Sequence, residues 1–221
     1  LAALLAIASV WNSATAAPAA APRRPNIVFF LSDDHAWQTI GAYGSTLMNC
    51  QIVDNVTTTS FSTANGGGVA LSTLNYCTIS NNQALYAGGG CYSSAVYNSS
   101  IANNKCTHTG VGSGGGVYGG TQMVCEIKGN TAYFGGGSYG SALIENSALS
   151  GNSAMYGGGA YKSALRTCNV ISNAVLATSG STTVQGGGAY QCVLDRCTIA
   201  YNSANSVSPS TGQGWGGGVT D

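Results

Sequence analysis

Two adjacent carboxylates follow a continuous apolar run near the start of this 221-residue chain. The run extends from Ile27 to Leu31, and Asp33 and Asp34 come after one intervening serine. An uninterrupted apolar run predicts a buried parallel strand, and open α/β sheets bind ligands at the carboxyl ends of such strands. Carboxylate oxygens are the donors that Ca²⁺ and Mg²⁺ prefer. The pattern predicts a cation site at Asp33 and Asp34; the alternative is a solvated strand end, or a cap on the structure that follows.

The same segment, residues 25–45, resembles the first strand of the sulfatase family in its motif Pro25-Asn26-Ile27-(apolar)-Asp33-Asp34. The resemblance implies that the two aspartates hold a calcium ion beside a sulfate ester. Sulfatases also carry a Cys or Ser in the pattern C/S-x-P-x-R, which is oxidised to the formylglycine nucleophile. None of the eight cysteines is followed by Pro two residues later, and Ser208-Pro209 lacks the pattern and its Arg. We therefore expect no complete sulfatase site, and a sulfuric ester hydrolase fragment stays an alternative function.

A second set of ionisable residues recurs later in the chain. Glu145, Arg166 and Asp195 are separated by 21 and 29 residues, and Arg196 follows directly. Enzymes that cleave polysaccharides align several carboxylates, or carboxylates with cations, on one exposed surface. Because charges of opposite sign alternate here, we expect a surface salt-bridge ladder. A polysaccharide lyase or hydrolase is the second alternative function.

The composition excludes several classes of partner. Charged residues make up only 6% of the chain, and seven cations balance seven anions. Nucleic-acid binding needs clustered cations that neutralise phosphates, so we expect no nucleic-acid partner. The 33 glycines occur mostly in triplets rather than at every third position, which excludes collagen.

The first 21 residues predict an export signal. Residues Leu1 to Trp11 form an apolar run with one serine, and Ala14-Thr15-Ala16 offers an A-x-A cleavage site. The run is shorter than the roughly 20 apolar residues that span a bilayer, and no second such stretch follows. We therefore expect a truncated signal peptide and linker at residues 1–21, no transmembrane segment, and a protein that is secreted, periplasmic or on the outer cell surface. A buried helix is the alternative.

Seven glycine triplets recur at intervals of 21 to 30 residues between residues 66 and 218. A second motif keeps the same spacing: a Cys or Ser, an aliphatic residue two positions later, and an Asn three positions after that. Its asparagines are Asn55, Asn82, Asn104, Asn130, Asn152, Asn173 and Asn202. A fixed period of this length predicts a solenoid, and no unit contains a ten-residue amphipathic helix. The sequence therefore predicts an all-β, right-handed parallel β-helix of about six to seven coils over residues 49–221.

Stacked coils would place equivalent residues in columns. The asparagines would form a ladder at a bend, each side-chain amide bonding to the next. Four residues after the first Gly of a triplet comes a tyrosine in five units, which predicts an aromatic stack of Tyr92, Tyr118, Tyr139, Tyr161 and Tyr190. Eight residues after that Gly a further column would stack Leu74, Val96, Gln122, Leu143, Leu165 and Leu194, and the Cys and aliphatic residues of the second motif would form interior columns. The tyrosines and Trp215 would offer a platform for sugar rings; packing between coils is the alternative.

Two pairs of cysteines fall on neighbouring predicted coils. These pairs are Cys50 with Cys77 and Cys168 with Cys197, and the coil spacing is short enough for disulfides. Ser99 and Ser147 fill the same column, which indicates that small, unpaired residues suffice there. We therefore expect most of the cysteines to be free core thiols.

The string Ile79-x-x-Asn82-x-Ala84-x-x-x-Gly88-Gly89-Gly90-x-Tyr92 resembles the repeat of polymorphic outer-membrane proteins and related right-handed β-helix surface proteins. The resemblance covers about residues 49–221 and implies an exported, adhesin-like scaffold rather than a particular reaction. We thus expect a sulfatase-like segment at residues 22–48, followed by a non-catalytic β-helix that contacts glycans or another cell-surface ligand. The only cofactor that the sequence suggests is calcium at Asp33 and Asp34.

Overall fold

The computed structural model describes residues 45–58, 64–176, 183–205 and 213–221. Within these ranges the chain forms 29 β-strands, all paired in parallel, and no helix. Accordingly, the described residues include no helix able to cross a membrane. The predicted signal peptide lies outside these ranges, as does the sulfatase-like segment up to residue 44, including Asp33 and Asp34.

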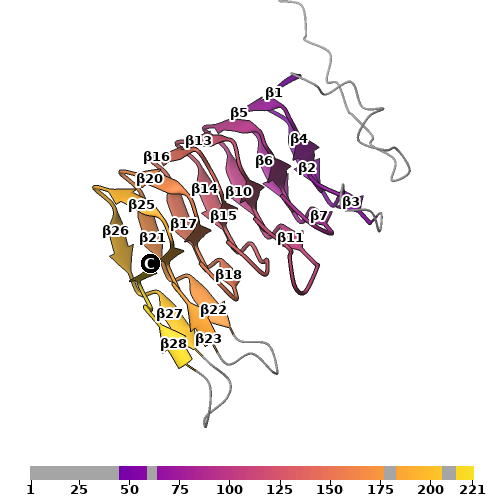
Figure 1. Ribbon diagram of the computed structural model, residues 1–221. Helices are drawn as coiled ribbons and strands as arrows, with labels where there is room; N and C mark the ends of the chain where they lie inside the picture. Colours follow the sequence, from indigo (N-terminus) through magenta and orange to yellow (C-terminus); the bar gives the residue numbers. More distant parts are fainter. Residues whose placement is uncertain (1–44, 59–63, 177–182, 206–212) are drawn as a thin grey trace, which may run out of the picture. The chain divides into compact units, whose positions relative to one another are not determined.

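Three parallel sheets of seven strands each run along the solenoid (Figure 1). The first sheet contains β1 (Thr46–Met48), β5 (Thr73–Asn75), β9 (Ala95–Tyr97), β13 (Thr121–Met123), β16 (Leu143–Glu145), β20 (Ala164–Arg166) and β25 (Val193–Asp195). The second contains β2 (Gln51–Val53), β6 (Thr78–Ser80), β10 (Ser100–Ala102), β14 (Glu126–Lys128), β17 (Ala148–Ser150), β21 (Asn169–Ile171) and β26 (Thr198–Ala200). The third contains β4 (Val69–Ala70), β8 (Cys91–Tyr92), β12 (Val117–Tyr118), β15 (Ser138–Tyr139), β19 (Ala160–Tyr161), β24 (Ala189–Tyr190) and β29 (Val219–Thr220).

Shorter ladders extend some coils beyond the second sheet. One joins β3 (Val56–Thr57), β7 (Gln83–Ala84) and β11 (Lys105–Cys106), and another joins β18 (Ser153–Ala154), β22 (Ala174–Leu176) and β27 (Ser203–Asn205). A further pair joins β23 (Thr183–Gln185) and β28 (Gln213–Trp215).

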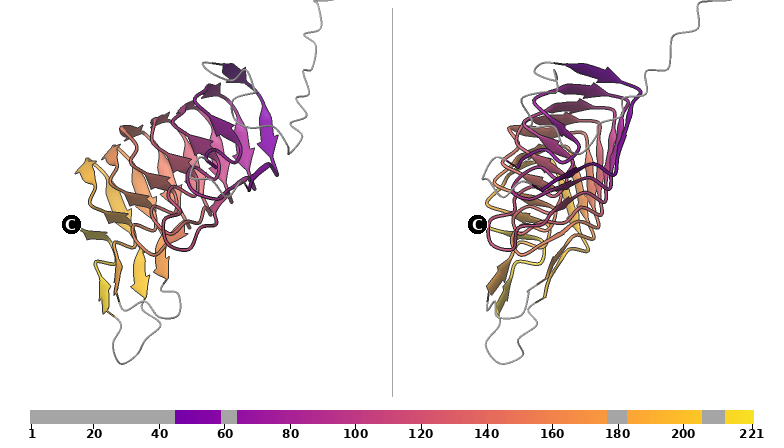
Figure 2. Two further views of the ribbon diagram at one scale, coloured as in Figure 1. Left: turned by 45° about the vertical axis from the view of Figure 1, so that its right-hand side comes forward. Right: turned by 90° about the vertical axis from the view of Figure 1, so that its right-hand side faces the viewer.

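Neighbours in every sheet come from successive coils, and Figure 2 shows the coils following one another with their strands in register. This arrangement confirms the predicted all-β, right-handed parallel β-helix, with about six coils. The first strand begins at Thr46, so the first coil includes residues on both sides of the boundary predicted after residue 48.

The coils turn at corners where one residue, or two at Gly119 and Gly120, lies in the left-handed region. In the coil of β8, β9 and β10 these residues are Ser93, Asn98 and Asn103, with φ of 46°, 47° and 56°. The glycine triplets allow a left-handed backbone conformation and a close approach between successive coils. Gly88 has φ of +63°, which favours glycine, whereas a Cβ on Gly89 would meet the backbone oxygen of Gly115 in the next coil. The triplets are therefore required by backbone conformation and by close approach of successive coils.

The interior consists of aliphatic columns between the sheets. Ile79, Ile101, Ile127, Leu149 and Val170 stack in the second sheet and are fully buried. In the first sheet the predicted column is wrong at one position, because Ile144 pairs with both Gln122 and Leu165. One extra residue separates the preceding glycine triplet from the corner at Asn146, and it shifts Leu143 out of the interior register.

Candidate functional site

The third sheet carries aromatic side chains on its outer surface. In the strands that carry a tyrosine, the first residue, such as Val117 or Ala160, is buried in the interior. The tyrosine that follows it points to the opposite side of the sheet, because side chains alternate along a strand. Consecutive ring centroids lie 5.2, 5.1, 5.1 and 5.0 Å apart along Tyr92, Tyr118, Tyr139, Tyr161 and Tyr190. We call these five residues the tyrosine face.

The rings of the tyrosine face stack on one another. Their interplanar angles are 16° and 12° in the first two pairs and 35° and 36° in the last two. Tyr161 is only 9% exposed, and the other four are half-buried. Because each inner ring is covered on its faces by its neighbours, the ring edges and phenol hydroxyls are the parts that can meet a ligand. Sugar rings therefore have no free face to stack on at the inner positions.

A second aromatic column, which the sequence reasoning missed, lies beside the tyrosine face. Phe134 and Tyr156 stack on each other at 5.4 Å, and Phe134 also stacks on Tyr161 at 5.5 Å. The ring centroid of Tyr156 lies 6.0 Å from that of Tyr190. Both residues immediately precede a glycine triplet, and the positions before successive triplets pair between coils. The position directly before each triplet was therefore the signal from which this column could have been predicted, although other units have Ala87 or Ser113 there.

Two of these tyrosines, Tyr118 and Tyr156, hold their phenol protons more tightly than an ordinary tyrosine does. Burial, followed by the neighbouring phenols, raises the pKa of Tyr118 and of Tyr156 above the ordinary tyrosine value. Within the described ranges, Tyr190 is the only member of the tyrosine face whose hydroxyl takes a hydrogen bond from the protein, accepting from Gln191 Nε2 at 3.4 Å. Lys162 Nζ lies 5.2 Å from the centre of the Tyr161 ring. The hydroxyls of the four tyrosines of the face other than Tyr190 are therefore available as donors and acceptors.

The predicted asparagines lie in one column at the corner after the second sheet. Each Nδ2 donates to Oδ1 of the next asparagine at 2.9–3.1 Å, through Asn55, Asn82, Asn104, Asn130, Asn152, Asn173 and Asn202. From Asn82 onward, the same nitrogen also donates to a carbonyl of the preceding coil, at 2.8–3.0 Å. The side chains pack against the third glycine of each triplet except the last; a Cβ on Gly90, for example, would lie 3.0 Å from Asn104 Cγ. This column joins coils to one another and has no access to a ligand in its buried middle part.

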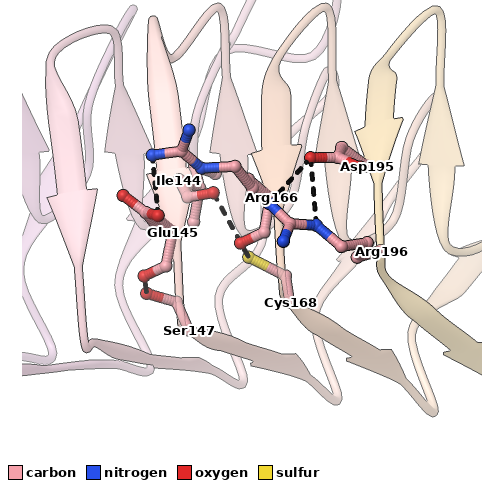
Figure 3. A network of polar contacts seen from close by, with 7 residues as sticks. All are labelled: Ile144, Glu145, Ser147, Arg166, Cys168, Asp195 and Arg196. Atoms are coloured by element: carbon pink, nitrogen blue, oxygen red, sulfur yellow. Dashed lines mark hydrogen bonds and ion pairs between the residues drawn. The ribbon is translucent and has the colours of Figure 1, made fainter.

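The charged set from β16, β20 and β25 forms a stripe on the outer surface of the first sheet (Figure 3). Arg166 Nη2 lies 2.7 Å from Glu145 Oε1, and Arg196 Nη2 lies 3.2 Å from Asp195 Oδ2. The hydrogen bond from Arg166 lowers the pKa of Glu145 below its ordinary value. Glu145 is thus held ionised by its partner, an arrangement that suits an ion pair better than a general acid.

No group of three or more His, Cys, Asp or Glu side chains that could hold a metal ion occurs in the part of the chain that the structure describes. Asp33 and Asp34, the predicted calcium ligands, lie outside that part. Comparison with known proteins finds no matching family model, no matching curated protein and no matching solved structure. The candidate site therefore rests on the geometry of the tyrosine face.

Proposed function

We propose that this protein is an exported, non-catalytic β-helix scaffold whose tyrosine face binds a neutral glycan. The observation that carries the proposal is the row of five tyrosines, four of them half-buried, with ring spacings of 5.0–5.2 Å. A polymer of sugars carries hydroxyls along its length, and a periodic row of phenol hydroxyls offers it repeated hydrogen bonds in one direction. The rigid parallel sheet beneath the rings keeps the row ordered before binding, which limits the entropy lost on association.

The charge of the surface supports a neutral ligand rather than a sulfated or uronic one. Acidic glycans are bound by clusters of Arg and Lys that meet their anionic groups. Here Lys162 is the only described cation that contacts a ring of the face, and the whole chain carries seven cations and seven anions. Neutral hydroxyl groups suit this surface best.

A binding experiment with hydroxyl-deletion variants tests the proposal. The probes are soluble neutral oligosaccharides of glucose, xylose and N-acetylglucosamine, titrated into the protein by calorimetry. The double variant Tyr118→Phe/Tyr139→Phe keeps the stack and removes two central hydroxyls. At about 1 kcal/mol per hydrogen bond, it should weaken binding by roughly 30-fold.

The matched control is Tyr76→Phe, because Tyr76 lies away from the face, at a corner between the first and second sheets, and is 59% exposed. This control should bind like the unaltered protein. No binding of any probe, or equal losses in the control and the double variant, would refute the proposal.

Two enzymatic alternatives remain as sequence hypotheses with their own tests. A polysaccharide lyase or hydrolase would use Glu145 and Asp195, so size analysis of incubated polysaccharides should show no shortening if the stripe only forms ion pairs. A sulfatase-type hydrolase would use calcium at Asp33 and Asp34, and turnover of an aryl sulfate in the presence of calcium would favour it over the scaffold.

A further inference from the structure

The cysteine column before the second sheet contains two pairs of directly adjacent thiols, one near each end of the described stack. Cys50 O accepts a hydrogen bond from Thr78 N at 2.9 Å, and Cys168 O accepts one from Thr198 N at 2.9 Å. The following residues are also in register, which places Cys77 beside Cys50 and Cys197 beside Cys168. Adjacent parallel strands lie about 4.8 Å apart, within the Cα separation of about 4.4–6.8 Å that disulfides require.

In each pair, the thiol of the second cysteine points toward the coil that holds the first. Cys77 Sγ lies 3.6 Å from Leu47 O, in the coil of Cys50. Cys197 Sγ lies 3.6 Å from Leu165 O, in the coil of Cys168. In both pairs, the sulfur of the second cysteine therefore contacts the coil that contains the first cysteine.

Cys125, the remaining cysteine of this column, has no cysteine in either neighbouring coil at the same position. Cys125 is buried between coils that carry Ser99 and Ser147 at the same position, and its backbone N donates to Ser147 Oγ at 2.9 Å. Cys91, Cys106 and Cys192 occupy other columns without a neighbouring cysteine in the same column. Only the two terminal pairs therefore combine adjacency with access, since Cys50 and Cys197 are partly exposed.

We propose that Cys50–Cys77 and Cys168–Cys197 are oxidation sites, which form two inter-coil disulfides when the protein meets a small-molecule disulfide such as oxidised glutathione. The inference goes beyond glycan binding, and only its physiological setting depends on export. It revises the expectation that most of the cysteines are free, because the described geometry distinguishes the paired cysteines from the isolated ones.

The chemistry is a thiol–disulfide exchange in two steps. In the first pair, the thiolate of partly exposed Cys50 attacks one sulfur of glutathione disulfide and expels one glutathione thiolate. The thiolate of Cys77 then attacks the Cys50 sulfur of the mixed disulfide and expels the second. Two protein thiols lose two electrons and two protons, and one external disulfide is reduced to two glutathione thiols. Cys197 and Cys168 react in the same order.

Access decides which thiol attacks first. Burial raises the pKa of Cys168 to about 11 and also raises that of Cys77, so neither forms a thiolate readily in the native fold. The partly exposed partner in each pair can reach the external disulfide. The buried partner then reacts within the pair, where the local concentration of its target is high.

The test equilibrates the reduced, full chain with excess oxidised glutathione until the thiol count is constant, then denatures and alkylates it. Intact mass should show four alkylated cysteines out of eight. Trypsin cuts after Arg196, between Cys168 and Cys197, and chymotrypsin cuts after Tyr190, which separates Cys192 from Cys168. Chymotrypsin also cuts after Tyr76, between Cys50 and Cys77, so both cross-links can be mapped. Eight alkylated cysteines, or cross-links between other pairs, would overturn the proposal.

Serine variants supply the controls, since Ser99 and Ser147 show that the column accommodates serine. Cys125→Ser should keep both disulfides, whereas Cys77→Ser should lose one and leave Cys50 alkylated. Equal effects of the two variants on the cross-link pattern would also overturn the proposal, and circular dichroism verifies that each variant is folded.

Discussion

Replacing Asn130 by alanine is the sharpest perturbation of the asparagine column. Asn130 is fully buried, and its side chain makes four hydrogen bonds. Its Oδ1 accepts from Asn104 N at 2.8 Å and from Asn104 Nδ2 at 3.1 Å. Its Nδ2 donates to Ile101 O at 2.9 Å and to Asn152 Oδ1 at 3.0 Å. The substitution therefore breaks contacts with the coils on both sides.

The expected cost follows from these four bonds. A protein hydrogen bond contributes about 1 kcal/mol net, and a buried group left without a partner costs at least as much. Asn130→Ala should thus lower the free energy of unfolding by about 4 kcal/mol. Asn202→Ala, at a half-buried position with solvent access, should cost less than half of that, because water replaces part of the lost bonding.

Urea unfolding followed by far-UV circular dichroism measures the difference. The slope with urea must be compared as well, because solenoids can lose coils separately rather than all at once. Asn169→Ala is the matched control, since Asn169 is exposed on β21, and it should change stability by no more than about 0.5 kcal/mol. If Asn130→Ala and the control have the same effect, the reasoning about the column is wrong.

Three further predictions concern the corners, the triplets and the charged stripe. Val124→Asn should stabilise the fold by about 1 kcal/mol in thermal unfolding, because Val124 is 54% exposed with φ of 57°, a conformation that asparagine adopts more readily than a β-branched residue. Gly89→Ala should cost about 3 kcal/mol, since its Cβ would meet backbone of the next coil, whereas Gly151→Ala, which faces open space at φ of +61°, should cost about 1 kcal/mol; equal costs would contradict the close-approach argument. NMR titration should find the Glu145 carboxyl with a pKa below its ordinary value, returning toward it in Arg166→Gln. Because that pKa is lowered on folding, the ion pair stabilises the protein above the ordinary carboxyl pKa, and the contribution is lost as the pH falls through the lowered value.

The sequence was sufficient to predict the fold because its constraints repeat. A glycine triplet that must permit close approach and an asparagine that must bond between coils recur in every unit, so their spacing reveals the coil without any structural information. The error at Leu143 arose because a constant offset from the triplet ignores a single inserted residue, and only the pairing of Ile144 with Leu165 reveals the shift.

The candidate site was only partly predictable. The tyrosine column follows from the offset, but the sequence cannot show that the rings cover each other's faces, which depends on side-chain rotamers. Phe134 and Tyr156 gave a weaker signal, since the position before the triplet is aromatic in only three of the seven units. Likewise, spacing placed Cys50 near Cys77, but only the structure shows which member of each pair is accessible.

The central claim is that the tyrosine face binds a neutral glycan without cleaving it. NMR spectra of the tyrosine ring signals, recorded during titration with a neutral oligosaccharide and assigned with the single Tyr→Phe variants, test this claim directly. The account predicts saturable shifts for Tyr118 and Tyr139, none for Tyr76, and an oligosaccharide of unchanged length after the titration. Unshifted signals on the face, shifts centred on Tyr76, or a shortened oligosaccharide would contradict it.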